Sequence, residues 1–167
     1  MGASYSTGAT GARIAGAGDQ LVTFRDDELR FYVADLAAAR VLLPAPIVAV
    51  AHDGRRVAAL DAAGTLHVLG EHARRTVPIA GTPRALIAGP RGAWLALCAE
   101  RAWLVRDGEH VPIDVPGALA AAADPDGTLL VIGDGGCFAT WRDGVLVERP
   151  PALEPLRACA ALGGGRF

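Results

Sequence analysis

The stretch "DPDGTLLVIGDGGCFATWRDG", residues 124–144, combines two apolar runs with three turns. Its opening Asp-Pro-Asp-Gly is a favourable β-turn sequence, and Asp134-Gly135-Gly136 separates the two runs. Short apolar runs bounded by such turns are typical of paired antiparallel strands. The stretch therefore predicts a β-hairpin that is entered through one turn and left through another.

Turns that end in glycine recur along the chain at a regular spacing. They end at Gly54, Gly92, Gly127 and Gly165, which lie 38, 35 and 38 residues apart. A run of small or β-branched residues precedes each turn, and an earlier copy of this run occupies 14–20. A fixed period of this size indicates a repeat architecture. Glycine and proline recur too often for helices of ordinary length, so the repeat unit is expected to consist of strands.

Three further runs follow the first run of each repeat, so that each repeat is expected to form four short strands. The second runs are 21–24, 56–61, 93–98 and 128–133; the third are 29–33, 65–70, 102–107 and 137–143; the fourth are 40–44, 75–80, 110–115 and 144–149. A single four-stranded sheet cannot bury both of its faces, so neighbouring sheets must stack. First runs are built from Ala, Gly and Val, which suits a crowded axis, whereas fourth runs admit the charged residues of an outer edge.

These features predict an all-β fold, a partial or open β-propeller of four complete four-stranded antiparallel blades plus the first strand of a fifth. After a flexible N-terminal tail at 1–11, the expected blade boundaries are 12–46, 47–83, 84–117, 118–156 and the start of a fifth at 157–167. Because most closed propellers have more than four blades, we expect part of a larger propeller. The alternative is a four-bladed ring whose last strand joins the first blade.

The repeat resembles the WD40-like β-propellers. The resemblance rests on residues 124–144 and on their sister stretch "AHDGRRVAALDAAGTLHVLGE" at 51–71, and it extends over 12–165. The Gly-His pair of that family is missing, and its closing Trp-Asp appears only loosely as Trp141-Arg142-Asp143. The resemblance implies a propeller that binds proteins, while other propeller families, some with enzymatic members, remain open.

Charge and hydropathy limit the classes of partner. The net charge is −2, and all 16 basic residues are arginine, so neither nucleic acid nor a membrane surface is expected as a partner. No apolar run reaches the ~18 residues of a membrane helix. The N-terminal residues lack the charged and apolar regions of a secretion signal, and we expect a cytoplasmic protein.

No pattern of reactive or metal-binding side chains stands out, and the sequence predicts no catalytic residues, no metal site and no cofactor. Cys98, Cys137 and Cys159 lie in apolar runs without metal-ligand spacing and are expected to be buried free thiols. The four histidines are scattered and are expected at the surface or half-buried. Asp124 with Asp126 fits a β-turn better than a calcium loop. The tryptophans are expected to fill the wedges between blades; they are Trp94, Trp103 and Trp141.

Arginines at equivalent blade positions provide the one candidate site. Arg84 and Arg157 each lie eight residues before a turn glycine, and Arg13 is close to the same place in the first blade. Because equivalent positions in different blades meet around one rim, these residues could form a basic mouth for an anionic ligand or an acidic peptide, joined by others near the fourth strands, namely Arg40, Arg74 and Arg75. The alternative is that each arginine is a solvated strand end paired with a neighbouring acid.

The expected function is that of a non-catalytic protein-interaction scaffold with a protein or peptide partner, and the arginines suggest an acidic one. One alternative is a propeller-type enzyme, a hydrolase or a quinone-dependent oxidoreductase, whose active site lies in blades outside this chain. Another is a structural blade set that completes a different subunit. In each case the apolar faces of the end blades are expected to favour association.

Overall fold

In the residues that it describes, the computed structural model contains seventeen strands, which form four separate antiparallel sheets. It describes residues 3–4, 13–17, 20–33, 36–70, 73–124, 127–142, 145–149 and 159. Each sheet is formed by strands that follow one another in the chain, as the repeat predicts. The all-β partial propeller is therefore confirmed.

The sheets correspond to the four predicted blades. Blade 1 contains β1 (Ala3–Ser4), β2 (Arg13–Ala17), β3 (Gln20–Arg25), β4 (Glu28–Val33) and β5 (Leu36–Leu42). Blade 2 contains β6 (Ile47–His52), β7 (Val57–Asp61), β8 (Thr65–Leu69) and β9 (Arg74–Pro78). Blade 3 contains β10 (Pro83–Ala88), β11 (Trp94–Cys98), β12 (Ala102–Arg106) and β13 (Glu109–Ile113). Blade 4 contains β14 (Ala120–Ala123), β15 (Leu129–Ile132), β16 (Phe138–Arg142) and β17 (Val145–Arg149).

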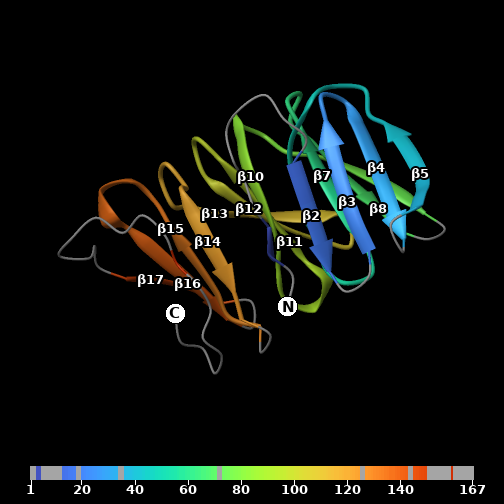
Figure 1. Cartoon of the computed structure of the whole chain (residues 1–167). Coiled ribbons are helices and arrows are strands. Elements are labelled where there is room, and N and C mark those ends of the chain that lie inside the picture. Colours follow the sequence, from blue (N-terminus) through green and yellow to red (C-terminus); the bar gives the residue numbers. More distant parts are fainter. Residues whose placement is uncertain are drawn as a thin grey trace.

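The four blades follow one another in chain order across Figure 1, from blue to orange. Two details concern the chain ends. Ala3 and Ser4, within the expected N-terminal tail, form the strand β1 and pair with Gly16 and Ala15 of β2. The predicted first strand of a fifth blade, at 157–167, lies outside the described residues except for Cys159.

Alternation along the strands gives each of the two middle blades two apolar faces. On β11, Trp94, Ala96 and Cys98 pack toward blade 2, whereas Leu95 and Leu97 pack toward blade 4. All five side chains are buried, which is what a central strand between two stacked sheets requires. A third core joins blades 1 and 2 through residues that include Val22, Leu29, Val57 and Ala59. The core of the protein therefore consists of layers between blades.

The turns between the first and second strands repeat a backbone conformation that favours glycine. Gly92 and Gly127 have φ angles of 74° and 105°, and a Cβ at Gly92 would collide with the Arg56 guanidinium. The glycine spacing seen in the sequence therefore reports this conformation and a close approach between blades. Across the described ranges, no helix is long and apolar enough to span a bilayer.

Candidate functional site

Four turns of blades 2 and 3 lie at one end of the sandwiched sheets and form a surface that we call the turn face. It contains the turns β6–β7, β8–β9, β10–β11 and β12–β13, together with the strand ends beside them. Arg56 of blade 2 hydrogen-bonds to Gly92 of blade 3, and Arg75 of blade 2 to Asp107 of blade 3. The turns of the two blades are therefore neighbours.

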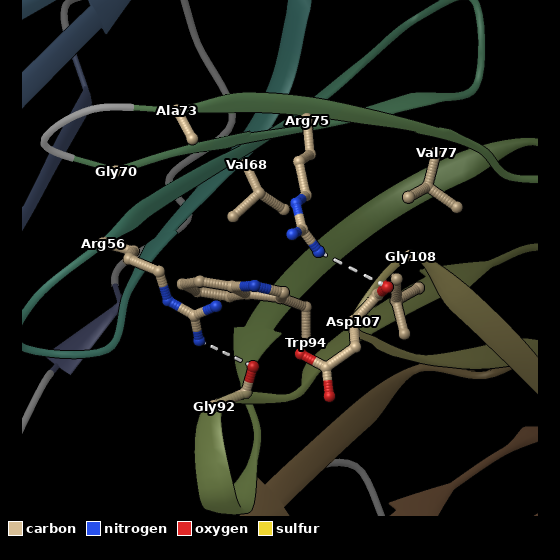
Figure 2. A pocket seen from close by; sticks show the side chains of 11 residues that line it. Arg56, Val68, Gly70, Ala73, Arg75, Val77, Gly92, Trp94, Asp107 and Gly108 are labelled. Atoms are coloured by element: carbon tan, nitrogen blue, oxygen red, sulfur yellow. Dashed lines mark hydrogen bonds between the residues drawn. The ribbon is translucent and has the colours of Figure 1, made fainter.

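A pocket of about 250 Å³ opens between the two blades at this face. Figure 2 shows its lining, which comes from blade 2 (Arg56, Val68, Gly70, Ala73, Arg75, Val77) and from blade 3 (Gly92, Trp94, Val105, Asp107, Gly108). The valines and the Trp94 ring make its walls apolar, while both guanidinium groups lie at its edges. A small ligand group or several waters would fit this volume.

Trp94 combines deep burial with a missing hydrogen bond. Its side chain is 2% exposed and belongs to the core between blades 2 and 3, which confirms its predicted place in the wedge. Yet its Nε1–H has no hydrogen-bond partner among the described residues. In Figure 2 the indole is seen edge-on inside the pocket with its nitrogen in front. An unsatisfied buried N–H costs about 1–3 kcal/mol, so this nitrogen calls for an explanation.

Arg56 connects the two blades beside the indole. Its guanidinium donates to Asp53 Oδ2 at 2.7 and 2.9 Å and to the Gly92 carbonyl at 2.7 Å, and it lies 5.4 Å from the Trp94 ring centroid. Burial alone would raise the pKa of the Asp53 carboxyl, but hydrogen bonds from Arg55 and Arg56 hold that pKa below its ordinary value. The positive charge of Arg56 is therefore largely matched by Asp53.

Arg75 is the less constrained of the two pocket arginines. Its side chain is exposed, and its guanidinium donates to the carbonyl of Asp107 at 3.4 Å, a long hydrogen bond. In the view of Figure 2 it lies above the indole of Trp94. An exposed arginine with one weak contact can move at little cost, which suits a group that meets a ligand.

Basic residues outnumber acidic ones on the turn face. Its described arginines are Arg55, Arg56, Arg74, Arg75, Arg91 and Arg106, and its described carboxylates are Asp53, Asp107 and Glu109. Within this set, Arg56 forms an ion pair with Asp53. Although the chain as a whole has a net charge of −2, arginines outnumber carboxylates two to one among the described residues of this face of blades 2 and 3.

The opposite end of blade 3 carries balanced charge. Arg84, the second residue of β10, is exposed there and lies near Glu100, whose pKa is lowered by the Thr82 backbone N–H and, to a smaller extent, by Arg84. Arg101 forms a 3.3 Å ion pair with Asp114 at the same end. This end therefore lacks the excess of arginine seen on the turn face.

The predicted mouth arginines are only partly placed. Arg13 is the first residue of β2, equivalent to Arg84 in β10, while Arg157 lies outside the described residues. Arg74 and Arg75 begin β9, whereas Arg84 is near the start of β10. Because β10 starts at the end of the blades where β9 finishes, Arg74 and Arg75 lie at the opposite end from Arg84. Arg40 is paired with Glu28 at 2.7 Å. A mouth formed by Arg13, Arg84 and Arg157 remains a prediction, without Arg74 and Arg75.

Sequence reasoning missed the pocket and a buried polar pair. His67 Nε2 lies 2.7 Å from Asp61 Oδ2, and both side chains are 1% exposed, whereas we expected the histidines at the surface or half-buried. The signal was available, because Asp61 ends one strand and His67 lies on the same face of the next. Cys98 is fully buried, but Cys137 and Cys159 are only partly so. In the described part of the chain, no three metal-ligating side chains converge.

Comparisons with known proteins agree on the fold. No protein-family model matches the chain, and no curated protein matches it in sequence. Among solved structures, it is similar to a streptogramin B lyase, with a TM-score of 0.72 and 10% identity over 92% of this chain. It is also similar to a catalytically inactive virginiamycin B lyase from Staphylococcus aureus with quinupristin, with a TM-score of 0.71 and 12% identity over 95% of this chain.

A third similar structure is BamB from Moraxella catarrhalis, with a TM-score of 0.65 and 17% identity over 81% of this chain. The chain spans 60% and 64% of the two lyase chains and 47% of the BamB chain. At these identities the similarity establishes the propeller fold alone. The residues of the turn face must therefore be judged by their own chemistry.

Proposed function

We propose that this blade set is a non-catalytic interaction module that binds an acidic protein or peptide through the turn face of blades 2 and 3. One observation carries the proposal: this surface has six described arginines and only three described carboxylates. Guanidinium groups bind carboxylates in two-point contacts and are well suited to acidic partners. A positive face on a negative chain also orients such a partner during its approach.

The buried polar chemistry of the chain supports a role without catalysis. The carboxylate–imidazole pair Asp61–His67 resembles an acid–base pair in its residue types, but at 1% exposure it is closed to a substrate. Its remaining polar atoms bond to the Thr65 backbone and to Arg74. The pair therefore supports the β7–β8 turn, and the rigid blades around it provide a platform for exposed turns.

Further blades complete the ring in this proposal, supplied by a longer chain or by another subunit. The support is the open row of four blades and the 60–64% of the lyase chains that the blades span. A WD40-like repeat is the proposed variant, because 51–71 and 124–144 share its order of turn, strand, glycine turn and strand. The similarity to two lyases favours an enzymatic propeller as the second candidate.

The test is binding of a short glutamate-rich peptide, measured by fluorescence anisotropy, with the corresponding glutamine peptide as the neutral comparison. The wild-type chain is expected to prefer the glutamate peptide, and added salt is expected to weaken that binding. The double variant Arg91→Glu with Arg106→Glu should weaken binding of the glutamate peptide at least about tenfold. Both residues are exposed on the turn face, so each substitution replaces attraction of the peptide with repulsion.

Arg84→Glu is the control, and it is compared with Arg91→Glu alone, which makes the same change of charge on the turn face instead of at the opposite end of blade 3. Arg84→Glu should leave binding of the glutamate peptide within about twofold of wild type. If Arg84→Glu weakens binding and the turn-face pair does not, the predicted mouth is the binding site and the proposal is wrong. Equal binding of both peptides would also contradict it.

A further inference from the structure

The pocket between blades 2 and 3 contains two kinds of hydrogen-bond donor that the protein leaves poorly satisfied. Trp94 Nε1–H has no partner among the described residues, and the Arg75 guanidinium has a single 3.4 Å contact to the Asp107 carbonyl. Both residues line the same space of about 250 Å³. A group that brings acceptor oxygens into this space would satisfy both donors at once.

We infer that this pocket binds the carboxylate of an acidic side chain or a chain end of the partner, with Trp94 Nε1–H and Arg75 as its hydrogen-bond donors. The inference rests on the proposed function and names the group that the turn face recognises. A carboxylate has two acceptor oxygens and a negative charge, so it satisfies the indole N–H and pairs with the guanidinium together.

The geometry of the pocket requires one side chain to move. Trp94 Nε1 exposes less than 1 Å² of surface, so an incoming oxygen reaches it only after a lining group shifts. Arg75 is the group best able to shift, because it is exposed and weakly held. Arg56 stays in place, since its contacts to Asp53 and Gly92 are short. Arg75 therefore acts as both cover and binding group.

The apolar walls of the pocket favour a carboxylate that is attached to a short hydrocarbon stem. Val68, Val77 and Val105 line it together with the face of the Trp94 ring. The short methylene stem of an acidic side chain can contact these walls while its oxygens reach the donors. A neutral amide of the same shape also presents a carbonyl oxygen, but it carries no charge for Arg75.

The indole N–H resonance of Trp94 provides a direct readout of the pocket. The full chain is labelled with ¹⁵N, and Trp94→Phe assigns the Trp94 resonance among the three tryptophans. Succinate is then titrated against succinamide. Succinate is expected to move the Trp94 indole resonance in a saturable way, and succinamide is expected to move it much less.

Trp103 is the internal control. Its Nε1–H already donates to the Ala80 carbonyl at 2.8 Å, so its resonance is expected to stay in place with either compound. Arg75→Gln is expected to reduce the affinity for succinate at least about fivefold while the protein stays folded. A Trp94 resonance that moves equally with both compounds, or with neither, would overturn the inference.

The same variants separate this inference from the proposed function. Trp94→Phe is expected to weaken binding of the glutamate peptide about fivefold or more, and Trp103→Phe is expected to leave it unchanged. If the turn-face pair Arg91→Glu and Arg106→Glu abolishes peptide binding while Trp94→Phe does not affect it, the turn face binds the partner and the pocket does not bind its carboxylate. Thermal melts of each variant verify folding.

Discussion

His67 donates its Nε2–H to Asp61 Oδ2 at 2.7 Å. Both side chains are buried, and His67 lies opposite Ala59, on the face of blade 2 that packs against blade 1. The tautomer follows from the network, because Arg74 donates to His67 Nδ1 at 3.1 Å and leaves the proton on Nε2. The second oxygen of Asp61 accepts from the Thr65 backbone N–H at 2.8 Å. The pair therefore satisfies a buried carboxylate at the turn between β7 and β8.

Removing the histidine is expected to destabilise the protein strongly. His67→Ala leaves the Asp61 carboxylate with one hydrogen-bond partner in a dry site, and the expected loss in free energy of unfolding is about 3 kcal/mol. Thr76→Ala is the control, because Thr76 pairs with His67 across the strands but is exposed, and it should cost less than about 0.5 kcal/mol. Urea unfolding measures both, and equal stabilities would contradict a structural role for the pair.

His52 is expected to make stability depend on pH near neutrality. Burial, opposed by the Asp53 charge, lowers the pKa of His52 in the folded state below its ordinary value of 6.5. The unfolded chain then binds the proton more tightly, so the stabilising contribution of His52 is complete above pH 6.5 and is lost as the pH falls toward the folded pKa. Protonation of Nδ1 would also remove its bond from the Gly54 N–H, which is 2.8 Å long.

The measurement is the melting temperature from pH 8 down to pH 5 for wild type and His52→Gln. The wild-type melting temperature should fall more steeply than that of the variant below about pH 6.5. Parallel curves for the two proteins would show that His52 does not contribute to the pH dependence.

Cys98 is expected to be unreactive in the folded protein. Burial, helped by the Glu100 carboxylate, raises the pKa of its thiol to about 11, so little thiolate is present at neutral pH. Iodoacetamide should modify Cys98 only in denaturant, as followed by mass spectrometry of the peptide that contains it. Rapid modification under native conditions would mean that the contact between blades 2 and 3 opens readily.

The layer between blades 3 and 4 is expected to be as tightly packed as that between blades 2 and 3. Leu95 is fully buried there together with Leu129 and Val131, and Leu95→Ala should cost about 2–5 kcal/mol. Val111→Ala, on the exposed outer strand β13, should change stability by less than about 0.5 kcal/mol. A small effect of Leu95→Ala in thermal or urea unfolding would show that blade 4 is loosely attached.

The repeat was predictable because the turn conformation is encoded locally. Gly92 and Gly127 need positive φ angles, and short apolar runs mark the strands between them. The pocket was not predictable, because it depends on contacts between blades such as that of Arg56 with Gly92, thirty-six residues away. Nor could the sequence reveal that Trp94 Nε1 lacks a partner among the described residues, since Trp103 packs against the same layer between blades 2 and 3 and its Nε1–H is satisfied.

The positions of the arginines were also only partly predictable from the sequence. Blade equivalence predicted a mouth that includes Arg13 and Arg84; these are the first residue of β2 and the second of β10, and the mouth itself stays a prediction. We predicted that Arg74 and Arg75 would join this mouth, because they are close in sequence to a fourth strand. The direction of β9 instead places both residues at the turn face. A charge pattern becomes a surface only when the direction of each strand is known.

Hydrogen–deuterium exchange of the full chain with and without the glutamate-rich peptide tests the central claim most directly, because it locates the bound partner without any substitution. Binding on the turn face predicts slower exchange at three turns of blades 2 and 3, namely 53–56, 89–93 and 106–109. Slower exchange at 81–84 and 99–101 instead, with the three turns unchanged, would place the partner at the opposite end of the blades and contradict the account.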